Sequence, residues 1–306
     1  MAITHADGWA GLDLRHLAAL EAVAHAGSFA KAAAGLGYTQ PAISQQIAAL
    51  ERIVGQRLFE RQSGPKPVTL TEAGELLLRH AEAIQARLSA AQADMDALAA
   101  GTAGTLRVGT FQSVAARILP ELVVRFRADW PDVEVQLTEL DDDEDLLDLV
   151  ERGELDLTFV MLPYREGPFE VAEALLDPYV VLARPGSGIE SIEDLNGKPL
   201  IAFRNCRSSA LCEGALRARG IEPNVVFRSD DNGTVQGFVA TGLGVAVMPR
   251  LSVGLDDPRT EVIPLDDLPP RRIGVAWHRD RYRSPAFDAF VQLALVSDGA
   301  AAVSIA

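Results

Sequence analysis

A change in residue composition and hydrophobic pattern at Gly101–Gly104 limits what this chain can fold into more than any other feature. Residues 12–100 are rich in Ala, Leu and Gln and poor in strand formers, a composition typical of helices. From Thr105 onward, short apolar runs alternate with helical patterns, which is typical of βα units around a mostly parallel sheet. The A-A-G-T-A-G stretch between them predicts a short flexible joint. We therefore expect a helical N-terminal part and an α/β C-terminal part.

The length and the cysteine count favour a soluble protein of the cytoplasm. At 306 residues, the chain is longer than a domain built on a single hydrophobic core usually is, so we expect a small domain joined to a larger one. It has no run of about 18 apolar residues, and its first residues lack the charged and apolar regions of a signal peptide. Two cysteines, Cys206 and Cys212, cannot form the disulfide framework of a secreted protein, which fits a reducing compartment.

A formal net charge of −15 at first argues against nucleic acid binding, which normally needs a basic footprint. The charge is unevenly distributed, however. Through Leu70 there are six Lys and Arg against five Asp and Glu, whereas residues 101–306 hold 20 against 33. The N-terminal part is therefore nearly neutral, and the acidic second part does not exclude DNA binding by the first.

The N-terminal part begins with three predicted helices. The first spans Leu14–Ala26, where apolar residues recur at helical spacing. Ser28 caps a second, short and alanine-rich helix. Thr39 is a good N-cap for a third helix that runs to about Val54, and Pro41 lies in its first turn, where a missing N–H does no harm.

The third helix has a polar outer face that is uncharged at its start. Its apolar stripe points inward and leaves Gln40, Ser44 and Gln45 on the other side. Amides bind base edges, hydroxyls reach phosphates, and a helix N-terminus favours an anion, so this face suits a major-groove reader. The alternative is the solvated face of an ordinary three-helix bundle.

The residues after the third helix favour the DNA-reader interpretation. L-F-E-R and then S-G-P-K-P-V-T-L-T-E-A-G predict two short strands joined by a polar turn, with Arg57, Arg61 and Lys66 available to phosphates. This arrangement is a wing. Three helices followed by a basic wing make a winged helix-turn-helix.

These motifs resemble the DNA-binding signature of the LysR-type transcriptional regulators nearly letter for letter. The matching runs are G-S-F at Gly27–Phe29, T-Q-P-A-I-S-Q-Q-I-A-A-L-E at Thr39–Glu51, G-Q-R-L-F-E-R, and T-L-T-E-A-G. The resemblance extends more weakly through the rest of the chain, where V-A-T-G-L-G-V-A-V-M-P at Val239–Pro249 is similar to the effector-domain signature of that family.

The resemblance implies a regulator that binds double-stranded promoter DNA and is not an enzyme, with RNA polymerase as a candidate partner. It implies that the groove face includes Pro41 and that Arg61 contacts the DNA backbone. Gln45 stands where many members have Arg, so one charged contact is absent. The DNA-binding candidates are Ser28, Thr39, Gln40, Pro41, Ser44, Gln45, Arg57, Arg61 and Lys66.

A long helix is predicted from about Glu72 to Ala99. Its apolar residues follow a strict 4, 3, 4, 3, 4, 3 spacing at Leu77, Ala81, Ile84, Leu88, Ala91, Met95 and Leu98. This is the seam of a two-stranded coil, which predicts self-association through Leu77, Ile84, Leu88 and Met95. A helix packed on its own domain is the alternative. A dimer, or the homotetramer that the resemblance implies, multiplies DNA affinity and predicts a pseudo-palindromic site.

The second part resembles, as in that family, a periplasmic-binding-protein fold of type 2, with two α/β lobes and a ligand cleft between them. We place lobe one at about 105–177 with a return segment at 277–298, and lobe two at about 178–276. The expected fold class is therefore α/β, with a winged helix-turn-helix at 1–71, a linker helix at 72–100 and a two-lobed effector domain at 101–306.

Effector-binding candidates follow the predicted strands of both lobes. Ligands in open α/β sheets lie at the carboxyl ends of strands, where helix N-termini offer N–H groups. Ser113, at such a position, is equally an ordinary N-cap, and Met161 is more often a core residue. The candidates are Thr110, Gln112, Ser113, Met161, Arg204, Cys206, Ser208, Asn232 and Thr234.

An acidic run at Asp141–Asp145 leaves the charge of the effector open. Such a run is typically a solvated face, and acids suit a helix N-terminus. If it faces the cleft, a cationic or metal-bearing effector is indicated instead. That conflicts with Arg204 and Arg207, which suit an anion, and the sequence alone leaves both alternatives standing.

Other functional classes find less support in the sequence. Cys206 and Cys212 are a redox-switch alternative, but a helical Cys is usually a small buried hydrophobe. The five His residues show no metal-ligand spacing, and nucleophile or phosphate-binding motifs are absent, so we expect no cofactor, metal or catalysis. A solute-binding protein would leave the first hundred residues unexplained. A repressor that needs no ligand remains a third alternative.

Overall fold

The computed structural model describes residues 9, 11–60, 67–100, 104–204, 207–254, 257–265 and 268–296. It divides into two units, Met1–Gln92 and Ala93–Ala306, each with its own hydrophobic core. Their boundary falls inside the long helix α4 (Glu72–Ala100), earlier than the Gly-containing joint predicted from the sequence. Within the described ranges, no helix combines the length and the apolar character that crossing a membrane requires.

The N-terminal unit is the predicted set of three short helices packed on the start of α4. Its helices are α1 (Leu14–Ala26), α2 (Phe29–Leu36) and α3 (Gln40–Val54). Side chains that the sequence marks as N-caps begin two of them: the Ser28 hydroxyl accepts from the Lys31 N–H, and the Thr39 hydroxyl accepts from the Ala42 N–H. Gly27 ends α1 with a φ of 61°, which an L side chain rarely adopts.

Among the described residues, the predicted wing contains one β-bridge. Phe59 pairs with Leu70, and the Glu60 N–H donates to the Thr69 carbonyl at 2.9 Å. Gly74 of α4 packs so tightly against this bridge that an added Cβ would lie 2.1 Å from the Leu58 carbonyl oxygen, so only glycine fits. The turn at residues 61–66, with Arg61 and Lys66, lies outside the described residues.

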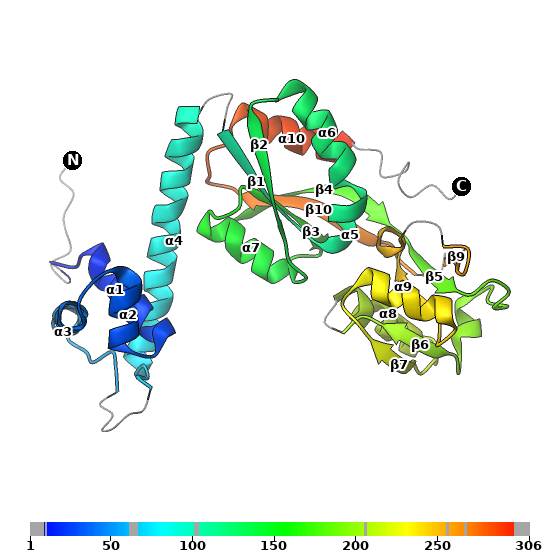
Figure 1. Ribbon diagram of the computed structural model, residues 1–306, viewed down its shortest axis with the longest axis horizontal. Helices are drawn as coiled ribbons and strands as arrows, with labels where there is room; N and C mark the ends of the chain where they lie inside the picture. The colour runs from blue at the N-terminus through cyan, green and yellow to red at the C-terminus, as the bar shows by residue number, and fades with distance from the viewer. Residues whose placement is uncertain are drawn as a thin grey trace. The chain divides into compact units, whose positions relative to one another are not determined.

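Lobe one of the C-terminal unit is a five-stranded sheet in the order β2-β1-β3-β10-β4 (Figure 1). Its strands are β1 (Gly104–Thr110), β2 (Val133–Glu139), β3 (Leu157–Leu162), β4 (Phe169–Asp177) and β10 (Arg271–His278). The first three are parallel, and β10 runs antiparallel to both β3 and β4. The helices are α5 (Gln112–Arg117), α6 (Leu119–Asp129), α7 (Asp143–Arg152) and α10 (Pro285–Val296).

Lobe two joins two smaller sheets. In the first, β5 (Tyr179–Ala183) lies between β8 (Ala246–Pro249) and β9 (Glu261–Pro264); in the second, β6 (Pro199–Ala202) is parallel to β7 (Asn224–Arg228). A bridge between Leu200 and Val245 links the two. The helices are α8 (Arg207–Ala218) and α9 (Asn232–Thr241), with short 3-10 turns at Ile192–Leu195 and Arg250–Ser252.

The chain crosses between the lobes twice, and the second crossing differs from the sequence-based expectation. The first runs from β4 directly into β5, as predicted near Asp177. The return strand β10 begins at Arg271, six residues before the expected start of the return segment at 277. The strand begins with Arg271 and Arg272, and two charged residues are not a sequence signal for a buried strand. Arg271 can be buried there because Asp177, from the other crossing segment, neutralises its charge.

Candidate functional site

The polar face of α3 is the candidate DNA-reading surface. Its buried side, made of Ile43, Ile47 and Leu50, packs into the core of the N-terminal unit. Because this stripe fixes the rotation of the helix, the opposite side is turned to solvent, and there Gln40, Pro41, Ser44 and Gln45 are all exposed. Their side chains are free to reach base edges.

Exposed cationic side chains lie on α3 itself and on the segments before and after it. Lys31 on α2, Arg52 near the end of α3 and Arg57 before the bridge are all exposed, so their charges are available to phosphates. Ser28 and Thr39 sit at the N-termini of α2 and α3, where their hydroxyls already accept backbone hydrogen bonds.

The apolar row of α4 divides into a buried and an exposed part. Leu77 and Ala81 belong to the core of the N-terminal unit, so Leu77 does not contribute to an exposed seam as the spacing predicted. The remaining large side chains of the row are all exposed: Ile84, Leu88, Met95 and Leu98. Leu88 and Met95 are more than half exposed, at 52% and 62%. An exposed apolar row on a helix is the kind of surface that a second copy covers.

A cleft of about 170 Å³ lies between the two lobes of the C-terminal unit. Lobe one lines it with Phe111, Gln112, Ser113, the acidic segment Asp141–Glu144 and Met161. Lobe two and the connecting segments add Phe203, Arg207, Ser208, Asp230, Asn232, Pro249, Ser252 and Arg271. Twelve of these sixteen residues are polar or charged, and only Phe111, Met161, Phe203 and Pro249 are apolar, so the cleft suits a small polar molecule.

The structure brings together five of the effector-binding candidates and leaves the others apart. Gln112, Ser113, Met161, Ser208 and Asn232 all line the cleft. A second group does not line it: Thr110 is buried with its hydroxyl on the Phe111 carbonyl, and neither Arg204 nor Thr234 reaches the lining. Cys206 lies outside the described residues.

Several hydrogen bonds cross the cleft and hold the lobes together. The Gln112 side chain donates to Asp231 at 3.0 Å and accepts from the Asn232 N–H at 3.1 Å. On the other side, the Arg207 guanidinium donates to the carbonyl oxygens of Met161, at 3.1 Å, and of Pro163. Because only a few groups make these contacts, a ligand that forms further hydrogen bonds with both lobes would shift the equilibrium between the arrangements of the two lobes.

A buried ion pair ties the two crossing segments together beneath the cleft. The Arg271 guanidinium donates to Asp177 at 2.5 and 3.1 Å, and neither side chain is more than 6% exposed. Burial raises the pKa of Asp177, although Arg271 and the Leu251 N–H act in the opposite direction. Arg271 also donates to the Ser113 hydroxyl at 2.9 Å. The hydroxyl hydrogen of Ser113 therefore points elsewhere, and no acceptor within the described ranges takes it.

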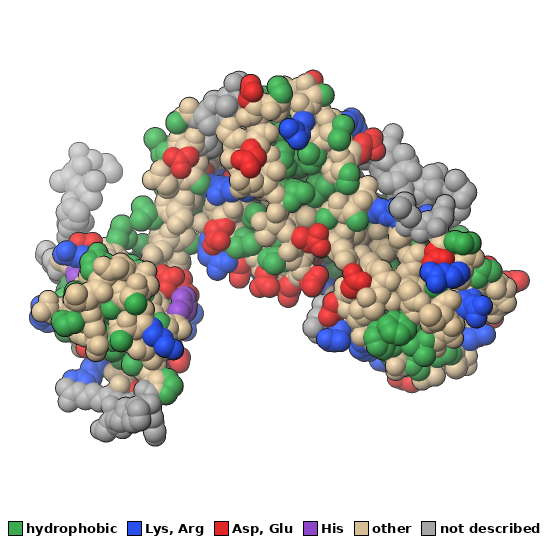
Figure 2. Space-filling model, viewed as in Figure 1, with side chains coloured by type: hydrophobic (Ala, Val, Ile, Leu, Met, Phe, Trp, Pro, Cys, Tyr) green, Lys and Arg blue, Asp and Glu red, His purple; other side chains and the backbone are tan. Residues whose placement is uncertain are grey.

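The acidic segment Asp141–Glu144, which was not among the effector-binding candidates, forms one wall of the cleft. Asp142 caps α7 by accepting from the Glu144 N–H, and the Asp143 carboxylate accepts from the Met161 N–H at 2.8 Å. Burial raises the pKa of Asp143, while the Met161 N–H and the charges of Arg207 and Arg271 act to lower it. Acidic side chains gather over α7 (Figure 2). Asp145 is exposed and lies outside the cleft.

Sequence reasoning had a signal for this acidic wall, but none for Arg271. The acidic run follows a strand that ends at the cleft, so its position was available from the pattern. Arg271 reaches the cleft because it pairs with Asp177, which lies 94 residues earlier in the chain. Such long-range pairing leaves no trace in local sequence.

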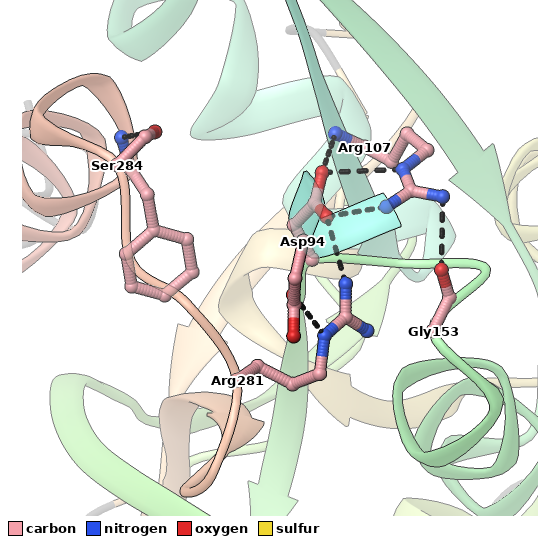
Figure 3. Close-up of polar contacts among 7 residues, drawn as sticks. Asp94, Arg107, Gly153, Arg281 and Ser284 are labelled. Atoms are coloured by element: carbon pink, nitrogen blue, oxygen red, sulfur yellow. Dashed lines mark hydrogen bonds and ion pairs between the residues drawn. The ribbon is translucent and has the colours of Figure 1, made fainter. Parts of the chain in front are cut away.

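The C-terminal end of α4 is anchored to the base of lobe one (Figure 3). Arg281, in the loop after β10, donates to Asp94 of α4 at 2.5 Å, and its side chain is 9% exposed. Beside it, Arg107 donates to Asp156 and to the Gly153 carbonyl. A cavity of about 370 Å³ lies next to these residues.

Comparison with known proteins identifies both parts of the chain. The family described as bacterial regulatory helix-turn-helix protein, lysR family, matches residues 14–75, and the LysR substrate binding domain matches residues 99–296. Together these define a DNA-binding transcriptional regulator with an effector-binding domain. The chain belongs to the LysR family, which confirms the resemblance seen in its sequence motifs and the expected fold class.

Individual relatives agree with this assignment over most of their length. The transcriptional regulator CbbR of Rhodospirillum rubrum is 32% identical over 85% of this chain and 87% of that protein. CfxR of Cupriavidus necator is 30% identical over 87% of this chain and 84% of that protein. Full-length CbnR, solved in complex with its target DNA, matches the fold with a TM-score of 0.66 at 24% identity, covering 92% of this chain and all of that one.

Proposed function

We propose that an effector bound in the interlobe cleft controls how a homo-oligomer of this protein sits on a pseudo-palindromic promoter site. The observation that carries this proposal is the presence, on one chain, of three separate surfaces. They are the polar face of α3, the exposed apolar row of α4 and the two-lobed cleft. Each surface suits a different partner, namely DNA, a second copy and a small molecule.

The first part of the proposal concerns DNA. Gln40, Ser44 and Gln45 contact base edges in the major groove, while Arg57, together with Arg61 and Lys66, contacts phosphates. The exposure of the α3 face supports the base contacts. Because the N-terminal part is nearly neutral, a single copy binds weakly, and two or four linked copies bind tightly through a high effective concentration.

The second part concerns the oligomer. Ile84, Leu88 and Met95 lie on one exposed apolar row. Because these side chains are 42–62% exposed, covering each of them contributes roughly 1–2 kcal/mol, about half the value for full burial. A parallel or antiparallel pairing of two α4 helices covers this row. The resulting dimer or tetramer has the two-fold symmetry that a pseudo-palindromic site matches.

The third part concerns control, and it follows from linkage. A ligand shifts an equilibrium only by the difference between its affinities for the two states. An effector that contacts both walls of the cleft binds the closed arrangement of the lobes better than the open one. The oligomer then favours one spacing of its DNA-binding units. No catalytic step is needed for this change, and RNA polymerase is the partner that responds to it.

DNA binding to the region upstream of the protein's own gene, at two salt concentrations, tests this proposal, with the mass of the protein measured in parallel. Specific binding by a dimer or tetramer, lost on a fragment of shuffled sequence, is the expected result. A folded oligomer that binds both fragments equally, with and without cell extract metabolites, contradicts base readout. Binding that never responds to any metabolite favours a repressor that needs no ligand.

A further inference from the structure

We propose that the effector of the interlobe cleft carries a cationic group that is held against the acidic wall Asp141–Glu144. This inference rests on the proposed function, because it assigns a chemical class to the ligand of that same cleft. It also concerns the conflict in the sequence, where the acidic run indicated a cationic effector and Arg204 with Arg207 indicated an anionic one.

The lining of the cleft carries more negative than positive formal charge. Five carboxylates line the cleft, from Asp141–Glu144 in lobe one and Asp230 in lobe two, against the guanidinium groups of Arg207 and Arg271. The lining therefore has a net formal charge of −3. Acids face the space from both lobes, so a cation between them would be attracted to both walls, whereas an anion would be repelled.

The two arginines of the lining are already engaged by the protein. Arg271 is committed to Asp177, whose carboxylate lies outside the cleft lining but cancels its charge. Arg207 donates to the carbonyl oxygens of Met161 and Pro163. Arg207 keeps its charge, but that charge already acts on Asp143 of the acidic wall, so a ligand carboxylate would have to compete with the groups that both arginines already face.

The carboxylates of the lobe-one wall, in contrast, are only partly satisfied. Glu144 pairs with Arg165 at 3.1 Å, and Asp143 accepts from the Met161 N–H. Asp142 caps α7, whose N-terminal dipole offsets part of the negative charge. Asp141 is exposed at the mouth of the cleft and has no hydrogen bond or ion pair with any described residue. It is the carboxylate most available to a ligand.

A second, independent group at the cleft indicates what else the ligand carries. Ser113 is 3% exposed and lines the space, and its oxygen accepts from Arg271. Its hydroxyl hydrogen has no acceptor among the described residues, so it can donate to a ligand oxygen. The cleft therefore fits a compact molecule with an ammonium or similar cation at one end and a hydrogen-bond acceptor at the other.

Three probes of five carbon atoms each distinguish a cationic effector from an anionic one. 5-Aminopentanoate has one ammonium and one carboxylate group, 1,5-diaminopentane has two ammonium groups, and glutarate has two carboxylates. Binding of each at about 10 mM is followed by thermal shift and calorimetry, a concentration that reveals sites with millimolar Kd. We expect 5-aminopentanoate to bind best and glutarate not to bind, and we expect higher salt to weaken binding of the ammonium probes.

Asp141→Asn and Asp145→Asn form the matched pair of variants. Both remove one exposed carboxylate from the same helix start, but only Asp141 lines the cleft. Asp141→Asn should raise the Kd of the ammonium probes about three- to fivefold, because one charge pair with an exposed carboxylate is lost. Asp145→Asn should change it less than about twofold. Equal unfolding temperatures without probe show that both variants fold.

The proposal is overturned if glutarate binds as well as the ammonium probes, if no ammonium probe binds, or if the two variants lose affinity equally. Specific DNA binding is measured on the same preparations without probe. Intact DNA binding combined with failure of the ammonium probes rejects only the charge of the effector. Loss of specific DNA binding in the unaltered protein rejects the proposed function itself.

Discussion

The Nε atom of Arg281 lies 2.5 Å from the Oδ1 atom of Asp94, so a largely buried ion pair fastens the end of α4 to lobe one. Asp156 lies 4.0 Å from the same guanidinium, and one terminal nitrogen of Arg281 is buried without a partner among the described residues. The buried guanidinium of Arg281 therefore depends on Asp94 for its counter-charge more than an exposed arginine depends on its ion-pair partner.

Replacing Asp94 with Asn should destabilise the C-terminal unit by about 1–3 kcal/mol, because a buried guanidinium loses its main counter-charge. Urea denaturation followed by circular dichroism measures this change. Glu222→Gln is the control, since Glu222 pairs with Arg217 at the surface and such pairs contribute about 0–1 kcal/mol. Equal effects of the two changes would mean that the Asp94 pair contributes no more than a surface pair.

Replacing Gln45 with Ala should cost about 1–3 kcal/mol of binding to the specific promoter site and little on random DNA, because base contacts carry specificity. Arg57→Gln should weaken binding to both DNAs and reduce the salt slope by about 1, since a phosphate contact is lost. Fluorescence anisotropy titrations at several salt concentrations measure both. A loss for Gln45→Ala that is equal on the two DNAs would contradict base readout.

Replacing Leu88 with Glu should lower the mass of the oligomer, because a charge in an apolar helix seam must be desolvated when two copies pair. Affinity for the promoter should fall by at least about tenfold as the effective concentration of the second DNA-binding unit is lost. Light scattering and DNA titration measure the two effects. Leu76→Glu is the control, because Leu76 is also exposed on α4 but lies outside the row; it should leave the mass unchanged.

The pKa of Asp143 is raised in the folded protein, chiefly by burial, so folding favours its protonated form. The stability that comes from this preference is present below the unfolded pKa and is lost as pH rises through the folded pKa. Asp143→Asn should therefore stabilise the protein at pH 7, because the amide stays neutral and its oxygen still accepts from the Met161 N–H. The advantage should shrink as pH falls toward about 4, the unfolded pKa.

Denaturation of both proteins between pH 4 and pH 7.5 checks this sign. Asp145→Asn is again the comparison, because Asp145 is exposed and outside the cleft. A variant at position 143 that is less stable than the unaltered protein at pH 7 would show that the charges of Arg207 and Arg271 outweigh burial.

Replacing Arg271 with Met should cost about 3–5 kcal/mol of folding stability, because Asp177 is left buried without its counter-charge. The double change Arg271→Met with Asp177→Asn should recover part of that loss, since no unpaired charge remains. Thermal and urea unfolding measure both variants. A double variant as unstable as the single one would assign the loss to packing rather than to charge.

The sequence by itself determined the helices of the N-terminal part and their caps. Ser28 and Thr39 cap the helices that they were predicted to cap, and the apolar stripe of α3 faces the core as its spacing required. These features depend on residues a few positions apart, which is the range over which helix periodicity and capping act. The two-lobed fold and the family were also recognisable, because their motifs are contiguous.

Only the tertiary structure decided how those pieces are used. It divided the row of α4, turning Leu77 into the core and leaving Leu88 exposed. It placed Asp141–Glu144 on a wall of the cleft and excluded Arg204 from the lining. It also started β10 at Arg271, because Asp177, 94 residues away, supplies the counter-charge that lets an arginine be buried. Pairings at such separations depend on how distant segments pack, and local patterns carry no information about them.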